Sequence, residues 1–148
     1  MSVININGDI LKVQFGIICH QVNCMGKMGA GIALKIRKKW PIVYEDYIEA
    51  YNINQLYLGE VILSIIQPGE LYIANLCGQY NYGTNKRYTE YKAIEKCLMK
   101  VSAISNETGL QVYIPKNMGC ALAGGNWDIV EGLIKDILHD AVIVNYIN

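Results

Sequence analysis

The sequence carries no excess of charge and no long hydrophobic run, and each absence excludes a class of protein. Its 13 basic and 13 acidic residues give a formal net charge of zero. A broad surface for nucleic acids or anionic membranes is therefore not indicated. No apolar run approaches the roughly 20 residues that a membrane-spanning helix needs, and the first ten residues lack the basic and apolar regions of a secretion signal. We expect a cytoplasmic protein that does not enter a membrane.

Cysteine is present, but not in a pattern that builds a disulfide framework or a zinc site. The chain has five cysteines, an odd number, and no two of them form a CxxC pair. They are Cys19, Cys24, Cys77, Cys97 and Cys120. We expect reduced and mostly buried thiols, no metal ion and no cofactor.

The length and composition are those of one globular domain. The 148 residues, of which 52% are hydrophobic, are enough for a real core, and we expect a single domain over residues 1–148 and a monomer. Apolar runs rich in Ile, Val and Tyr predict strands that are buried on both faces. The predicted strands are Val3–Ile6, Gly16–Val22, Glu60–Ile66, Leu71–Leu76, Gln111–Ile114 and Ala141–Ile147.

Helical patterns separate these runs. The predicted helices are Ala30–Lys39, Pro41 to about Tyr51, Arg87–Ser105 and Asn126–His139. Strands that alternate with helices predict an α/β protein with three layers, α/β/α, around a central mixed sheet. In such domains a ligand binds beyond the carboxyl ends of the strands, where loops meet helix N-termini.

The most informative stretch is residues 19–33, CHQVNCMGKMGAGIA. A strand-like segment runs into a loop with Gly26, Gly29 and Gly31, and a helix follows at once. Glycines allow the backbone to approach an anion closely, and the first N–H groups of a helix have no partner within it. This stretch predicts a site for a phosphorylated ligand.

A second stretch, residues 113–127, repeats the order of strand, glycine loop and helix. Gly124 and Gly125 precede Asn126, a good helix cap. Two such loops are able to hold a diphosphate from two sides with backbone N–H groups. Neither loop has the lysine spacing of a Walker A motif or a GxGxxG followed by a ribose-binding acid, so a common nucleotide hydrolase or dehydrogenase site is not indicated.

At these residues the chain resembles the macrodomain family, which binds ADP-ribose. Four stretches carry the resemblance, in the family's order and across nearly the whole chain: Asn7–Ile10, Val22–Ala33, Met118–Trp127 and Val142–Tyr146. The resemblance implies a macrodomain-like fold. It also implies that the partner is ADP-ribose or a derivative of it, and an ADP-ribosylated macromolecule is a further possible partner.

The resemblance implies a role for each of four side chains. Asp9 would accept a hydrogen bond from the adenine amino group, Ile10 and Tyr146 would cover the adenine, and Asn23 would hold the distal ribose. Alternatives from the residues alone remain open. Asp9 also fits a turn after Gly8, Asn23 fits an Asx turn, and Tyr146 fits the edge of the core.

The two glycine loops are expected to line the ligand with backbone groups and small side chains. From the first loop these are Met28, Gly29, Ala30, Gly31 and Ile32. From the second loop they are Met118, Gly119, Cys120, Ala121, Leu122 and Ala123.

For catalysis the resemblance points to two activities, ADP-ribose 1″-phosphate phosphatase and terminal ADP-ribose glycohydrolase. In that glycohydrolase a lysine attacks the anomeric carbon and an aspartate assists; Lys86 falls where the lysine would be, but Ala123 stands where the aspartate would be. For the phosphatase we expect His20 as general base, Asn23 as the group that orients water and Lys86 beside the phosphate. His20 lies in an apolar strand, where a structural histidine is the alternative.

Three functions therefore follow. The first is hydrolysis of ADP-ribose 1″-phosphate or a related conjugate. The second is a non-catalytic module that binds ADP-ribose or an NAD-derived nucleotide, which Ala123 favours. The third is an ADP-ribosyl-protein glycohydrolase that uses Lys86.

Overall fold

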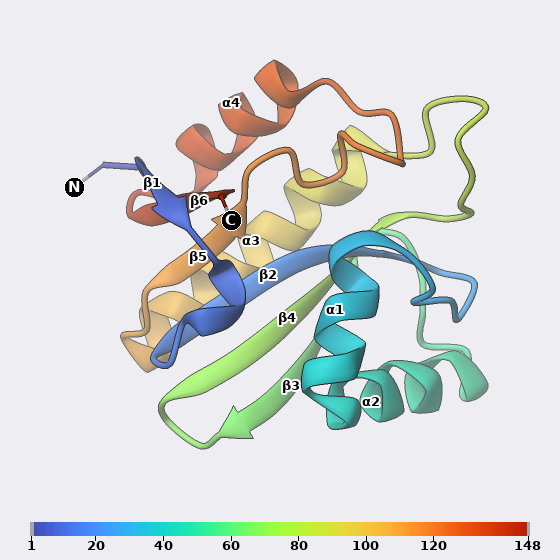
Figure 1. Cartoon of the computed structure of the whole chain (residues 1–148), viewed down its shortest axis with the longest axis horizontal. Coiled ribbons are helices and arrows are strands. Elements are labelled where there is room, and N and C mark those ends of the chain that lie inside the picture. The colour runs from blue at the N-terminus through green and yellow to red at the C-terminus, as the bar shows by residue number, and fades with distance from the viewer. Residues whose placement is uncertain (1, 148) are drawn as a thin grey trace.

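A computed structural model describes residues 2–147. Its six strands form one sheet, and Figure 1 shows the arrangement of the strands and helices. The order across the sheet is β1-β6-β5-β2-β4-β3, and all neighbours are parallel except β3 and β4. The strands are β1 Ile4–Gly8, β2 Gly16–Asn23, β3 Val61–Gln67, β4 Leu71–Gln79, β5 Val112–Pro115 and β6 Ala141–Tyr146. The sheet is mixed, as predicted.

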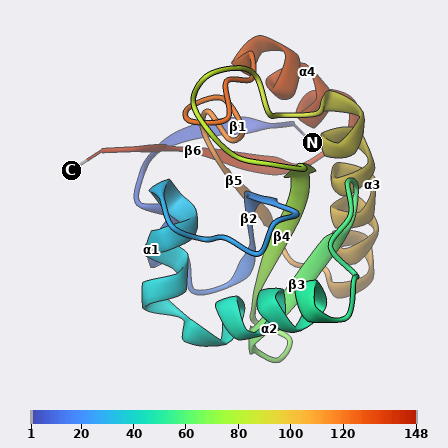
Figure 2. The same cartoon turned by 90° about the vertical axis from the view of Figure 1, so that its right-hand side faces the viewer.

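Four α-helices cover the two faces of the sheet. They are α1 Gly31–Lys39, α2 Pro41–Asn52, α3 Tyr91–Thr108 and α4 Trp127–Ile137. A turn of 3-10 helix, Ile10–Lys12, follows β1. Figure 2 shows α1 and α2 on one face and α3 and α4 on the other. The predicted three-layer α/β/α fold is therefore confirmed.

The central strand β2 divides its side chains between two cores because successive residues of a strand point to opposite faces. Ile17 and Cys19 pack beneath α3 and α4, whereas Ile18 and Val22 pack beneath α1 and α2. All eight residues of β2 are buried. This rigid strand ends at Asn23, and the first glycine loop begins there.

Two predictions about elements differ from the structure. The edge strands β1 and β3, each with one neighbour, are not buried on both faces: Ile4 and Ile6 of β1 are 49% and 42% exposed, and Ile65 of β3 is 53% exposed. The helix expected from Arg87 begins only at Tyr91. The segment before it is held as a loop, since the N–H groups of Tyr88 and Thr89 both donate to the Ala123 carbonyl.

Among the described residues, no helix combines the length and apolarity required to cross a membrane.

Candidate functional site

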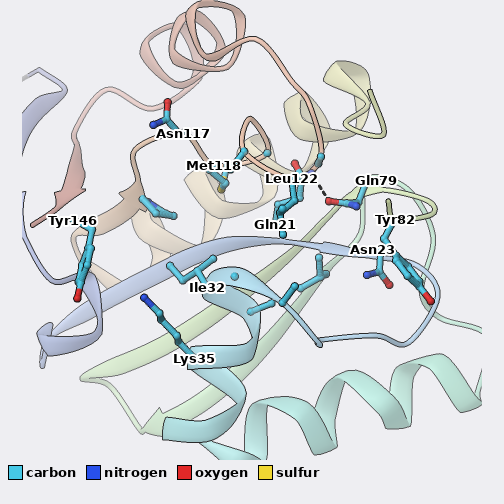
Figure 3. A pocket seen from close by; sticks show the side chains of 18 of the residues that line it. Gln21, Asn23, Ile32, Lys35, Gln79, Tyr82, Asn117, Met118, Leu122 and Tyr146 are labelled. Atoms are coloured by element: carbon cyan, nitrogen blue, oxygen red, sulfur yellow. Dashed lines mark hydrogen bonds between the residues drawn. The ribbon is translucent and has the colours of Figure 1, made fainter. Parts of the chain in front are cut away.

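A cavity of about 880 Å³ opens at the carboxyl ends of the parallel strands. Its walls come from the 3-10 helix, the loop and helix start after β2, the loops after β4 and β5, and the end of β6. Figure 3 shows Tyr146 and Lys35 at one end of the cavity and Asn23, Gln79 and Tyr82 at the other. We call these the Tyr146 end and the Tyr82 end.

Asn23 organises the first glycine loop. Its Oδ1 accepts hydrogen bonds from the Met25 N–H at 3.0 Å and the Tyr47 hydroxyl at 2.9 Å, and its Nδ2 donates to the Lys27 carbonyl at 2.8 Å. The bond from Met25 is an Asx turn, so the structural alternative for Asn23 is observed. Asn23 also lines the cavity, and one N–H of its amide has no partner among these bonds.

Tyr47 of α2 fixes the position of Asn23 through its hydroxyl. It is fully buried, and its hydroxyl lies 2.6 Å from the Asn23 carbonyl oxygen and 2.9 Å from Asn23 Oδ1. Burial raises the pKa of Tyr47 well above its ordinary value. The phenol therefore stays a neutral hydrogen-bond donor that fixes the start of the loop.

The N-terminus of α1 faces the cavity without a side-chain cap. Its first residue, Gly31, has a φ of +57°, and the capping residue Ala30 offers no side-chain acceptor to the helix N–H groups. Gly29, Ala30, Gly31 and Ile32 all line the cavity. Unpaired N–H groups at the positive end of a helix are a favourable place for an anion.

Met28 is a correction to the predicted ligand residues. Its side chain is 1% exposed and packs in the core beneath α1 and α2, so it does not line the cavity. The side chain is apolar, and the loop directs it into this core just before Gly29.

The second glycine loop forms the opposite wall. Gly119 and Gly124 both have a φ of +75°, and the Gly125 N–H donates to the Gly119 carbonyl at 2.9 Å, which closes the loop on itself. The residues of this loop that line the cavity are Met118, Gly119, Ala121, Leu122 and Ala123.

Cys120 is a second correction, because it does not line the cavity. Its Sγ lies 3.4 Å from the Met118 carbonyl oxygen, and burial raises the pKa of the thiol to about 11. A thiol in this state is protonated at neutral pH and is not an activated nucleophile.

Asp9 and Ile10 follow Gly8, the ladder partner of Tyr146, so they lie at the Tyr146 end. Asp9 Oδ1 accepts from the Leu11 N–H at 2.9 Å and caps the 3-10 helix, which is the turn role left open for it. Tyr146 is 55% exposed rather than part of the core edge, and the Lys35 ammonium lies 4.7 Å from the centre of its ring.

His20, the expected general base, does not reach the cavity. It is fully buried, and its Nε2 pairs with Oδ1 of Asn75, its partner across β2 and β4. Burial lowers the pKa of the imidazole to about 4. This placement corrects the prediction: the register of the two strands encloses His20 in the core.

Lys86 is also displaced from the predicted position. Its ammonium lies 5.1 Å from the centre of the Tyr88 ring, and it does not line the cavity. Tyr82, Gly83 and Thr84 of the same loop line the cavity instead. The sequence placed Lys86 near the site, but it did not indicate which part of the loop turns inward.

The sequence prediction missed Gln21 and Gln79. Gln21 Nε2 donates to Gln79 Oε1 at 2.8 Å (Figure 3) and to Thr89 Oγ1 at 2.9 Å. The Thr89 hydroxyl donates to the Gly119 carbonyl. This chain ties β2, β4 and the second glycine loop together. The sequence signal that could have indicated Gln21 is a glutamine within an otherwise apolar strand.

The lining carries a net positive charge although the whole chain is neutral. Its charged side chains are three lysines, Lys27, Lys35 and Lys116, and one acid, Asp9. Two positive charges remain, which favours a ligand with two negative charges. Within residues 2–147 no group of three His, Cys, Asp or Glu side chains is placed to hold a metal ion.

Known proteins resemble this chain in sequence. No family model matches it. It is 28% identical over 141 residues to an uncharacterized 17.5 kDa protein of Enterobacteria phage T4, covering 90% of this chain and 88% of that protein. An ADP-ribose 1″-phosphate phosphatase of Candida albicans is 26% identical over 145 residues, with 86% of each chain covered. A DNA ADP-ribosyl glycohydrolase of Mycobacterium tuberculosis is 23% identical over 84% of this chain, which spans only 35% of that protein.

Solved structures resemble it over nearly its whole length. A protein of unknown function from Bacteroides thetaiotaomicron superposes with a TM-score of 0.90 at 30% identity, covering 99% of both chains. A macrodomain protein from Streptomyces coelicolor superposes with a TM-score of 0.80 at 27% identity, again over 99% of both chains. With the six-stranded sheet and the two-loop cavity described above, these likenesses show that the chain has the macrodomain fold.

Proposed function

We propose that the cavity binds ADP-ribose. The observation that carries the proposal is the pair of glycine loops on opposite walls, one at the uncapped N-terminus of α1 and the other closed around Gly119. A diphosphate between these walls meets backbone N–H groups from two sides. The two positive charges of the lining favour the same group.

The ends of the cavity suggest the orientation of the ligand. At the Tyr146 end, Asp9 Oδ1 already accepts one hydrogen bond, and its second oxygen is free to accept from an adenine amino group. Tyr146 is 55% exposed and offers an aromatic face to the adenine ring, whereas the Ile10 side chain lines the cavity but is only 5% exposed. At the Tyr82 end, the unpaired N–H of Asn23 is left to donate to a hydroxyl of the distal ribose.

Titration of the protein with ADP-ribose in a calorimeter tests this proposal. We expect a single site, with competition by ADP and no measurable binding of ribose 5-phosphate. Absence of heat with ADP-ribose, in a protein whose circular dichroism shows it to be folded, would overturn the proposal.

Hydrolysis of an ADP-ribose derivative is the second candidate. It is supported by the names of relatives, and the phosphatase from Candida albicans matches over most of both chains. We infer that such a reaction would rely on transition-state stabilisation by the loops and on water oriented by the Asn23 amide. No imidazole or thiol lines the cavity in residues 2–147, and its one carboxylate, Asp9, lies at the Tyr146 end.

Two assays separate this activity from binding alone. Phosphate release is followed from ADP-ribose 1″-phosphate, and ADP-ribose release is followed from an ADP-ribosylated protein. Turnover of either supports a hydrolase, and binding of ADP-ribose without turnover leaves a binding module.

We also propose that the active form is a cytoplasmic monomer. Light scattering of the purified protein tests the oligomeric state, and cell fractionation tests the location.

A further inference from the structure

The cavity continues past Asn23 into a part that the two glycine loops do not account for. Gln79, Tyr82, Gly83 and Thr84 line this part. Gln79 is the ladder partner of Asn23 across β2 and β4. If ADP-ribose binds as proposed, these residues face the group that is attached to the anomeric carbon of the distal ribose.

The amide of Gln79 is held in one orientation. Its Oε1 accepts from Gln21 Nε2 at 2.8 Å, and its Nε2 donates to the Asn81 carbonyl at 2.9 Å. Gln21 cannot rotate away, because it is 9% exposed and its Nε2 also donates to Thr89. A primary amide has two donors and two acceptor positions. Gln79 therefore keeps one N–H and one lone pair for a ligand.

The other lining groups favour a flat substituent that is uncharged or cationic. Tyr82 is 51% exposed and offers an aromatic face, which attracts planar rings and cations. A phosphate dianion would meet no charged side chain among Gln79, Tyr82, Gly83 and Thr84. A carboxamide presents the donor and acceptor that a fixed glutamine amide complements.

We propose that Gln79, oriented by Gln21, is a specificity residue for a carboxamide on a planar ring attached to the distal ribose, and that the cavity accepts the intact dinucleotide NAD⁺. The pyridinium ring would lie against Tyr82, and its carboxamide would pair with the free edge of Gln79. This inference rests on the proposed binding of ADP-ribose and names a further ligand for the same site.

Four ligands and three variants, one of them a control, test it by calorimetry. The ligands are ADP-ribose, ADP-ribose 1″-phosphate, NAD⁺ and nicotinic acid adenine dinucleotide, which differs from NAD⁺ only by a carboxylate in place of the carboxamide. For the wild type we expect NAD⁺ to bind at least as tightly as ADP-ribose. We expect the carboxylate analogue to bind about tenfold more weakly than NAD⁺, because it cannot donate to Gln79.

The variants distinguish recognition from a general defect. Gln79→Leu should weaken NAD⁺ about tenfold more than it weakens ADP-ribose, and it should abolish the discrimination against the carboxylate analogue. Gln79→Glu keeps the acceptor for Gln21 and should increase the discrimination, since two carboxylates repel each other. Gln111→Leu, at the opposite ends of the strands, is the matched control and should change nothing.

The outcomes separate this inference from the proposed function. Binding of ADP-ribose with NAD⁺ at least tenfold weaker, or equal binding of NAD⁺ and its carboxylate analogue, overturns the inference alone. No binding of ADP-ribose overturns the proposed function.

Discussion

At the scale of single residues, Asn23 is both a loop-forming residue and a candidate ligand residue. Its Oδ1 accepts from Met25 and Tyr47, so only its Nδ2 has a hydrogen left to offer. The sequence presented these two roles as alternatives. The structure combines them, because an amide has enough donors and acceptors to serve a turn and still face the cavity.

The hydroxyl of Tyr47 is expected to support the first loop. Tyr47→Phe removes the donor to Asn23 and leaves a buried acceptor without it, so we expect a loss of about 1 kcal/mol in the free energy of unfolding. The affinity for ADP-ribose should fall several-fold. Tyr44→Phe is the control, since the Tyr44 ring packs against Arg37 and keeps that contact without its hydroxyl. Equal behaviour of the two variants in urea unfolding and calorimetry would refute the role of Tyr47.

The carboxylate of Asp9 is expected to select adenine. Asp9→Ala should weaken ADP-ribose by about tenfold or more, because a charge-assisted hydrogen bond is lost. Asp140→Ala serves as the control, since Asp140 is exposed and lies before β6, at the opposite end of the sheet. An unchanged dissociation constant for Asp9→Ala would show that the adenine binds elsewhere.

His20 predicts a specific dependence of stability on pH. Its pKa falls from 6.5 to about 4 in the folded protein, mainly through burial, so the unfolded chain binds more protons between these values. His20 therefore penalises the folded state increasingly as pH falls from about 6.5 to about 4, by up to about 1.4 kcal/mol for each pH unit. His20→Gln should flatten this part of the curve of unfolding free energy against pH. A curve identical to that of the wild type would mean that His20 is not buried as described.

At the scale of elements, the walls of the cavity depend on contacts between loops that are distant in sequence. The second glycine loop is tied to β2 through Gln21 and Thr89, and the Ala123 carbonyl holds the segment before α3. That segment has a helical apolar pattern from Arg87, yet α3 starts at Tyr91. Tertiary hydrogen bonds outweighed local propensity there.

Two Gly→Ala substitutions should change stability in opposite directions. At Gly119 a Cβ would lie 2.6 Å from Gln21 Oε1, and φ is +75°, so Gly119→Ala should destabilise the protein by about 1–3 kcal/mol and weaken ADP-ribose. At Gly132, inside α4, a Cβ meets nothing within 4 Å. Gly132→Ala should stabilise the protein by about 0.5–1 kcal/mol and leave binding unchanged. Thermal unfolding with and without ADP-ribose measures both, and a stabilised Gly119→Ala protein would contradict the packing described.

At the scale of the whole molecule, the neutral chain concentrates positive charge in its cavity. Lys27, Lys35 and Lys116 outnumber Asp9 there, while acids and bases balance overall. Composition alone gave no indication of a broad basic surface. It could not indicate this local positive charge, because the three lysines come from the loop after β2, from α1 and from the loop after β5.

The affinity for ADP-ribose is expected to fall with ionic strength. Raising sodium chloride from 0.05 to 0.5 M should weaken ADP-ribose several-fold, because salt screens the lysines from the diphosphate. Adenosine, which has no charge, should bind equally well at both concentrations. Equal salt dependence for the two ligands would show that the lysines do not act on the diphosphate.

The order of strands and helices, and the two glycine loops with their helices, were determined by the sequence alone. Apolar runs and glycines act locally, and α1 begins at Gly31, one residue after the predicted start at Ala30. The tertiary structure decided which side chains enter the cavity. It enclosed His20 and Met28 in the core, turned Lys86 onto Tyr88, and joined Gln21 to Gln79 across 58 positions. Strand register and loop packing set these directions, and both depend on partners that are far away along the chain.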